Sequence, residues 1–103
     1  MHFLQVLMIY GLLQRGNKIW TGSDRNSEVD FVCKTPTGDI EYYQVAWQMT
    51  DEKTIEREFS ALEKIKDNYP KYLLTTDGFT QDRNGIRHLN VFQWLLDNKE
   101  SQG

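Results

Sequence analysis

This chain of 103 residues has one cysteine, no excess of positive charge and no long apolar run, and each of these features argues against a class of protein. The single cysteine, Cys33, cannot form an internal disulfide, so we expect a fold held by its core in a reducing, cytoplasmic setting. The net charge of -3 disfavours a strongly electrostatic nucleic-acid binder, although it leaves room for a small basic patch. The most apolar stretch, 3–13, is too short to span a membrane, and it lacks the flanking signals of a leader peptide, so no membrane association is expected.

What is present is a globular composition, with 39% apolar, 13% aromatic and 26% charged residues. This balance can build one hydrophobic core, and the length fits one domain, 1–103. The ATP-binding signature G-x-x-x-x-G-K-[ST] does not occur in these residues.

The first segment reads as a helix over 3–15 that Gly16 ends. A stripe at helical spacing faces one side, and further apolar residues fill the other faces: Phe3, Leu7, Tyr10 and Leu13 make the stripe, and Leu4, Val6, Met8, Ile9 and Leu12 the rest. A helix that is apolar all round must be covered all round. Either both of its sides pack within the domain, or a partner covers one side.

Three strands are expected at 18–21, 28–34 and 40–47, the last two joined by a turn at 35–39. Strict alternation puts Val29, Phe31 and Cys33 on one face of the second strand and Glu28, Asp30 and Val32 on the other. On the third strand Gln44 and Ala46 share one face, while Tyr43, Val45 and Trp47 share the other. The register, which the sequence leaves open, decides whether Gln44 lies beside Asp30.

A long amphipathic helix follows, capped by Asp51 or Thr50 and predicted to end at Tyr69, before Pro70. Short strands at 72–75 and 86–89 and a helix at 91–96 complete the chain. The expected class is α/β (α+β): a mixed sheet in the order α-β-β-β-α-β, plus a terminal strand and helix.

The hairpin resembles a metal-dependent nuclease site of the PD-(D/E)xK type. Such a site has an acid on one strand, here Asp30, and an (E/D)-x-K tripeptide on the partner strand. The tripeptide positions hold Gln44 and Ala46, so an amide replaces the second carboxylate and a methyl group replaces the lysine.

Nearly the whole chain resembles an uncharacterised C-terminal domain of prokaryotic AAA+-type ATPases. The matching segments are 12–16, 28–32, 44–47, 56–59, Leu62, Ile65, 67–72, Asp77, and Gly85, Ile86 and His88, with Asp-Asn-Tyr-Pro-Lys-Tyr at 67–72 the most specific. The resemblance implies a restriction-endonuclease-like fold behind an ATPase domain. It makes this chain either an excised fragment or a stand-alone remnant.

Relatives often carry a Glu on the first helix, where this chain has Gln5. Of the four positions that carry the nuclease chemistry, 5, 30, 44 and 46, only Asp30 therefore keeps the expected residue type. One carboxylate with an amide is a poor Mg²⁺ site. Lys53 or Arg57 on the long helix could take over the lysine's role. We expect a catalytically degenerate domain that needs no cofactor and serves the ATPase as a binding or regulatory module, with the first helix contacting the ATPase domain or another copy.

Two alternatives stay open. The first is a metal-dependent DNA endonuclease, with Asp30 and Gln44 as ligands of Mg²⁺ or Mn²⁺. The second is a nucleic-acid-binding module that keeps the groove without cleaving. A Ser-His-Asp triad has no recognisable sequence context here.

Every other candidate residue also has a purely structural interpretation. Glu28 and Asp30 are expected to lie on a solvated face of the strand, and His88 is expected to be a polar strand residue. His2 is expected to belong to the start of the chain. The three tryptophans, Trp20, Trp47 and Trp94, are expected in the core or partly in it. The cations Lys64, Lys66 and Lys71 are expected to form a solvated face.

Overall fold

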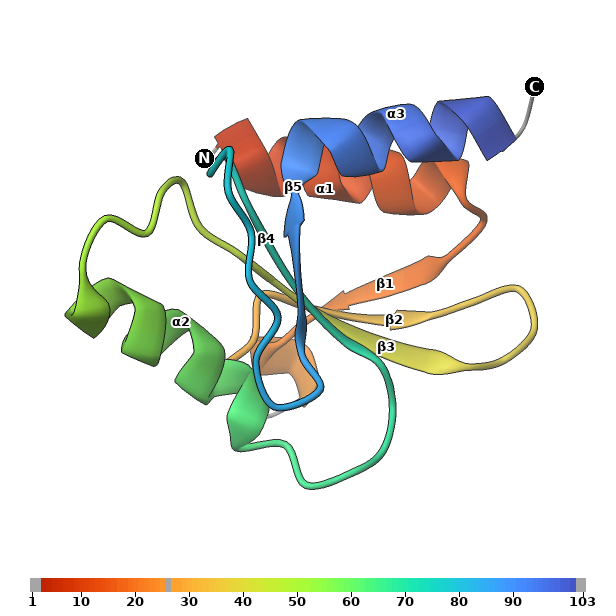
Figure 1. Cartoon of the computed structure of the whole chain (residues 1–103). Coiled ribbons are helices and arrows are strands. Elements are labelled where there is room, and N and C mark those ends of the chain that lie inside the picture. The colour runs from red at the N-terminus through yellow and green to blue at the C-terminus, as the bar shows by residue number, and fades with distance from the viewer. Residues whose placement is uncertain (1–2, 26, 102–103) are drawn as a thin grey trace.

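A computed structural model describes residues 3–25 and 27–101, so His2 lies outside the described residues (Figure 1). The helices are α1 (Phe3–Gln14), α2 (Glu52–Glu63) and α3 (Val91–Ser101), with a 3₁₀ turn, η1, at Ser23–Arg25. The strands are β1 (Lys18–Thr21), β2 (Phe31–Lys34), β3 (Ile40–Val45), β4 (Lys71–Thr75) and β5 (Arg87–Asn90). None of these described helices combines the length and apolar character that crossing a bilayer requires.

The strands form one mixed sheet in the order β1-β2-β3-β4-β5. The β1, β2 and β3 strands are antiparallel neighbours, and β4 and β5 run parallel to β3. The predicted mixed sheet of an α+β protein is therefore confirmed, including the parallel pairing after the crossover helix. Helices α1 and α3 lie side by side over one face, and α2 covers β3 and β4 on the other (Figure 1).

Each face of the sheet carries its own apolar cluster. The cluster under α1 and α3 contains Leu4, Met8, Leu12, Phe31, Cys33, Tyr43, Val45, Leu74, Val91 and Trp94. The cluster under α2 contains Val29, Val32, Phe59, Ala61, Leu62, Leu73 and Ile86. The predicted faces of Phe31, Cys33, Tyr43 and Val45 are confirmed, because all four pack toward α1.

Val29 lies on the opposite side from the one predicted. Strand β2 begins only at Phe31, and Val29 packs under α2 together with Val32. Before the strand, residues 28–30 form bends, and the backbone N–H of Asp30 donates to the side chain of Gln44 instead of to the backbone of the neighbouring strand. Residues 28–30 are therefore irregular, and strand alternation does not apply to them.

Helix α2 is shorter than predicted. Its N-cap is Asp51, as expected, and the side chain accepts a 2.8 Å hydrogen bond from Thr54 N. The helix ends at Glu63 rather than Tyr69. Asp67 explains the early end, because its carboxylate accepts from Tyr69 N and from the Tyr42 hydroxyl, which holds the segment in a turn.

Helix α1 is covered on one side only. Leu4, Met8 and Leu12 are buried against the sheet and α3. On the outer side Phe3, Tyr10 and Leu13 are 61%, 60% and 58% exposed. The helix ends as predicted at Gly16, which has a φ of 81° and places Asn17 N in a hydrogen bond with Leu12 O.

Candidate functional site

The four positions of the predicted vestigial site form two separate pairs near the end of β3, Asp30 with Gln44 toward α2 and Gln5 with Ala46 beside α1, so the prediction that Gln44 and Ala46 share one face is wrong. Pairing of Phe31 with Tyr43 brings Asp30 beside Gln44, which settles the register question. Gln5 and Ala46 line a small hollow of about 160 Å³ together with Val45. Val45 also joins the two pairs, because its backbone N–H donates to the Asp30 carboxylate at 2.9 Å.

A chain of hydrogen bonds connects Asp30, Gln44 and Glu58. The backbone N–H of Asp30 donates to Gln44 Oε1 at 3.0 Å. Gln44 Nε2 in turn donates to Glu58 Oε1, also at 3.0 Å. The second oxygen of Glu58 is paired with Arg57 Nε at 3.3 Å. This polar network ties the start of β2, the end of β3 and the middle of α2 to one another.

The orientation of the Gln44 amide is fixed by its partners. A backbone N–H can only donate, so the atom facing Asp30 N must be the amide oxygen. The amide nitrogen then faces the carboxylate of Glu58, which can only accept. The oxygen of Gln44 is thus already engaged, and its remaining polar atom is a donor that would repel a cation. These residues do not fit a Mg²⁺ site, which requires clustered oxygen ligands.

Residues 3–25 and 27–101 contain no group of three or more His, Cys, Asp or Glu side chains placed to hold a metal ion. Of the two predicted substitutes for the missing lysine, Arg57 does reach the polar network, although 71% of its side chain is exposed. Lys53 is exposed in the first turn of α2. Gln5 keeps a buried Oε1 with no hydrogen-bond partner in the described residues.

Glu58 is the member of the network that sequence reasoning missed. It is buried at 9% exposure, although it is a carboxylate. The signal was its position: Glu58 lies three residues after Ile55 and four before Leu62, on the apolar stripe of the helix. A charged residue on the buried stripe of a helix needs a buried partner, and Gln44 is that partner.

A second buried polar cluster surrounds His88 on β5. The ring Nδ1 accepts from Gln81 N at 3.2 Å, and Nε2 lies 2.8 Å from Thr75 Oγ1. Its backbone N–H donates to Asp82. Burial lowers the pKa of His88, against the opposing effect of the Asp77 and Asp82 carboxylates. A neutral ring protonated on Nε2 satisfies both contacts, so His88 holds the 76–85 loop against the sheet.

This loop borders a hollow of about 780 Å³ beside His88. Its walls include Ile55 and Phe59 from α2, and Phe79 from the loop. The lining also includes Arg83, whose guanidinium is paired with Glu56 at 2.6 Å.

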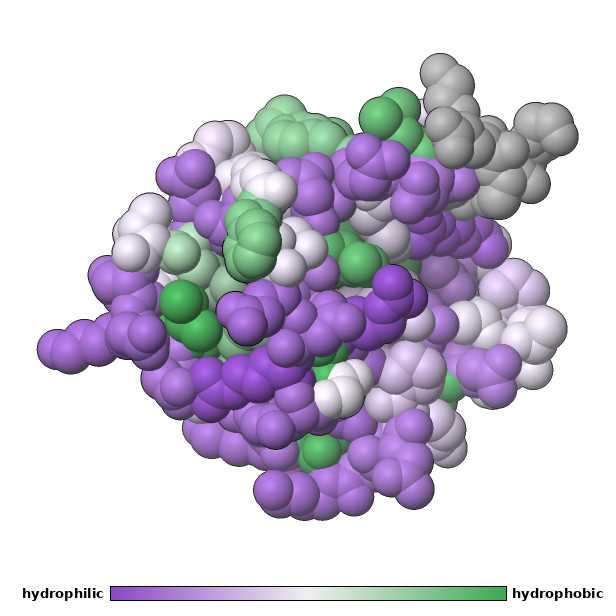
Figure 2. Space-filling model, in the orientation of Figure 1, coloured by the Kyte–Doolittle hydropathy of each residue, from purple (hydrophilic) through white to green (hydrophobic). Residues whose placement is uncertain are grey.

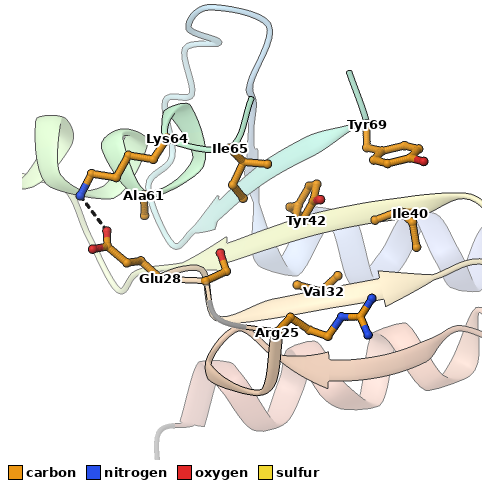
Figure 3. Close-up of a pocket in the computed structure, with 10 residues that line it drawn as sticks. Arg25, Glu28, Val32, Ile40, Tyr42, Ala61, Lys64, Ile65 and Tyr69 are labelled. Atoms are coloured by element: carbon orange, nitrogen blue, oxygen red, sulfur yellow. Dashed lines mark hydrogen bonds and ion pairs between the residues drawn. The ribbon is translucent and has the colours of Figure 1, made fainter. Parts of the chain in front are cut away.

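A shallow groove of about 570 Å³ opens on the same face of the sheet, beyond the C-terminal end of α2 (Figure 3). Its lining comes from the segment before β2, from β2 and β3, and from α2 and the segment that follows: Arg25, Ser27, Glu28, Val32, Ile40, Tyr42, Ala61, Lys64, Ile65 and Tyr69. Burial, and then the hydrogen bond to Asp67, raise the pKa of Tyr42 to about 12, so this phenol stays neutral.

The three tryptophans have different environments. Trp94 is buried in the core and Trp20 is half-buried, as expected, but Trp47 is 59% exposed because β3 ends two residues before it. The predicted solvated face of lysines is only partly correct. Lys64 is exposed and paired with Glu28 at 2.8 Å, whereas Lys71 is largely buried and paired with Asp67.

No family model, curated protein or solved structure matches this chain.

Proposed function

We propose that this chain is a catalytically degenerate PD-(D/E)xK-like domain that serves an AAA+-type ATPase as a binding or regulatory module. The order of its elements supports a restriction-endonuclease-like fold: a first helix, an antiparallel meander of three strands, a crossover helix and a parallel strand. Strand β5 and helix α3 then form an addition to that core.

The polar network is the observation that carries the proposal. In a working site of this class, the Asp30 and Gln44 positions would direct carboxylate oxygens at a common metal ion. Here the Gln44 amide links the Asp30 backbone to the Glu58 carboxylate. The Ala46 position, where the family has lysine, carries no charge to meet a developing anion. Through Gln44, the Asp30 and Gln44 positions thus hold α2 against the sheet.

The outer side of α1 is the surface best suited to binding a partner. It exposes Phe3, Tyr10 and Leu13, and the adjacent helix α3 exposes Phe92 and Leu96, both about half exposed. Figure 2 shows separate hydrophobic groups along the top edge of the molecule, where Figure 1 places these two helices. Exposed large apolar side chains that form a patch mark protein interaction sites. We assign this surface to contact with the ATPase portion or with another copy of the chain.

Catalysis is tested by titrating Mn²⁺ into the wild type and Asp30→Ala by calorimetry, with a plasmid-nicking assay on the same samples. We expect neither specific Mn²⁺ binding nor nicking from either protein. Binding and nicking by the wild type, both lost in Asp30→Ala, would overturn the proposal and make this domain an endonuclease.

The interaction surface is tested by sedimentation velocity over a range of protein concentrations. Self-association that disappears in Tyr10→Gln/Leu13→Gln but persists in Phe79→Gln would support contact through α1. Phe79 is a suitable control because it is 83% exposed and lies in the loop across the sheet from α1. A chain that stays monomeric at every concentration would refute self-association through this surface.

A further inference from the structure

Two lysines lie directly opposite each other on the side of the sheet that α2 covers in part. The register pairs Lys18 of β1 with Lys34 of β2, and residues directly opposite on adjacent strands project from the same face. Both side chains are exposed. Like charges in directly opposite positions destabilise a sheet, so this pair is an unfavourable arrangement that a bound anion would relieve. The next residue in the same row is Ile40, which lines the groove.

On the same side of the sheet, the next set of directly opposite residues contains two aromatic side chains. Trp20 of β1 lies opposite Val32 of β2, which lies opposite Tyr42 of β3. Arg25 lies over the Trp20 ring, with its guanidinium carbon 5.1 Å from the ring centroid. In Figure 3 the rings of Tyr42 and Tyr69 lie near Ile40 at one end of the groove, and Arg25 extends beside Val32. Tyr69 is 48% exposed, so its ring is accessible to a ligand.

Cations gather beside the groove although the chain as a whole carries a net charge of -3. The lining contains Arg25 and Lys64 against the carboxylate of Glu28. Lys34 lies opposite Ile40 of the lining, and Lys18 lies opposite Lys34. The carboxylate of Asp67, which accepts from Tyr42, is paired with Lys71. Glu28 is paired with Lys64 through an exposed contact, which adds little stability and can be exchanged for another anion.

We propose that this groove binds a nucleotide unit, with the base stacked against Tyr42 and Tyr69 and the phosphate held by Lys18, Lys34 and Arg25. Aromatic side chains beside a line of cations are the combination by which proteins hold single-stranded nucleic acids without sequence preference. The volume of the groove also lies within the range of small-molecule sites. A free mononucleotide and a nucleotide within a single strand share this chemistry.

The site is independent of the function proposed above, because it lies on the opposite face of the sheet from the outer side of α1 (Figures 1 and 3). It is also distinct from the polar network, which contributes no residue to the groove lining. The loss of one property would therefore leave the other measurable.

The experiment is a fluorescence anisotropy titration of the whole chain with a labelled short oligothymidylate at several salt concentrations. Thymidine monophosphate and inorganic polyphosphate serve as unlabelled competitors. The groove variants are Lys18→Gln/Lys34→Gln and Tyr69→Ala. The controls are Lys53→Gln/Arg87→Gln, which removes two exposed cations elsewhere, and Tyr10→Ala, which removes an exposed ring from α1.

We expect Tyr69→Ala to weaken oligothymidylate binding roughly 5- to 150-fold, the effect of losing one stacked base. The lysine pair variant should flatten the slope of log affinity against log salt by about 0.7 for each phosphate that the protein no longer neutralises. The controls should bind like the wild type. Competition by thymidine monophosphate would identify a free nucleotide as a ligand, and competition by the strand alone would identify a single strand. Equal competition by polyphosphate, unchanged binding in both groove variants, or no binding at low salt would overturn the proposal.

Discussion

Replacing Gln44 by glutamate tests whether the polar network has the polarity that its hydrogen bonds indicate. The substitution keeps the shape of the side chain and preserves the acceptor for Asp30 N. It removes the N–H donor to Glu58 and places a second carboxylate about 3.0 Å from the first. A hydrogen bond to a charged group contributes roughly 1.5–3 kcal/mol, and that contribution is lost.

The repulsion between the two carboxylates adds to this loss. Two unit charges 3.0 Å apart repel by about 5 kcal/mol at an effective dielectric constant of ~20. Proton uptake limits this repulsion, because one of the two carboxyl groups can bind a proton and lose its charge. Protonating an ordinary glutamate costs about 1.4 kcal/mol for each pH unit above its pKa of ~4.3. The repulsive part of the loss is therefore capped at about 4 kcal/mol at pH 7 and about 1 kcal/mol at pH 5.

The assay is urea unfolding of the wild type and Gln44→Glu between pH 5 and 8. The carboxyl introduced at position 44 has a raised pKa in the folded state, so its destabilising effect grows as pH rises and fades as pH falls. The matched variant is the exchange Gln44→Glu/Glu58→Gln, in which an amide at position 58 donates to the new carboxylate. It should recover most of the lost stability at pH 7. A Gln44→Glu variant as stable as the wild type, or an exchange variant no better than Gln44→Glu, would refute the assigned polarity.

Three further changes have defined outcomes. Asp51→Ala should lower the free energy of unfolding by about 1 kcal/mol in urea titrations, because Thr54 N loses its capping acceptor. An Asp51→Asn variant should lose much less unfolding free energy. Because the pKa of His88 is lowered in the folded state, its contribution to stability should be constant at pH values above 6.5, the ordinary pKa of histidine, and should decline as the pH falls below 6.5. The urea midpoints of His88→Gln should therefore show a flatter pH dependence than those of the wild type. Burial raises the pKa of Cys33 to about 12, so a thiol reagent should label the native chain very slowly at pH 8 and label it readily in denaturant; rapid native labelling would contradict this.

The parts of the fold that sequence reasoning predicted correctly depend on local signals. The cap at Asp51 and the stop at Gly16 are set by residues within one helical turn. The hairpin follows from turn residues between two apolar runs, and Gly38 does adopt the positive φ, 90°, that such a turn uses. The parallel pairing of β3 with β4 follows from the length of the crossover between them.

The errors occur where a side chain distant in sequence competes with the local pattern. The apolar stripe of α2 continues to Ile65 and Tyr69, yet the helix ends at Glu63 because Asp67 forms bonds to Tyr42, Lys71 and Tyr69. Likewise the alternation at 28–34 would place Val29 toward α1. The bends at 28–30, where Asp30 N donates to the Gln44 side chain, turn Val29 toward α2 instead.

The candidate site was predictable in position but not in chemistry. Spacing placed Asp30 and Gln44 on hairpin partners, and the register brings them together. The third member, Glu58, comes from an element that the hairpin pattern does not include. Whether the cluster could hold a metal depends on which atom of the Gln44 amide faces Asp30, and only the three-dimensional contacts fix that orientation.

The location of the polar network is consistent with the proposed role of the chain as a binding module. It lies where the sheet changes from antiparallel to parallel pairing, between β2 and β3 on one side and β4 on the other. Helix α2 crosses this junction and is held there by Glu58 as well as by Phe59 and Leu62. Buried polar pairs that are fully satisfied fix one arrangement of the elements that they join. The network thus fixes the position of α2 on the sheet, between the apolar outer side of α1 and the groove. If these two surfaces bind the proposed partners, this rigidity would lower the entropic cost of binding.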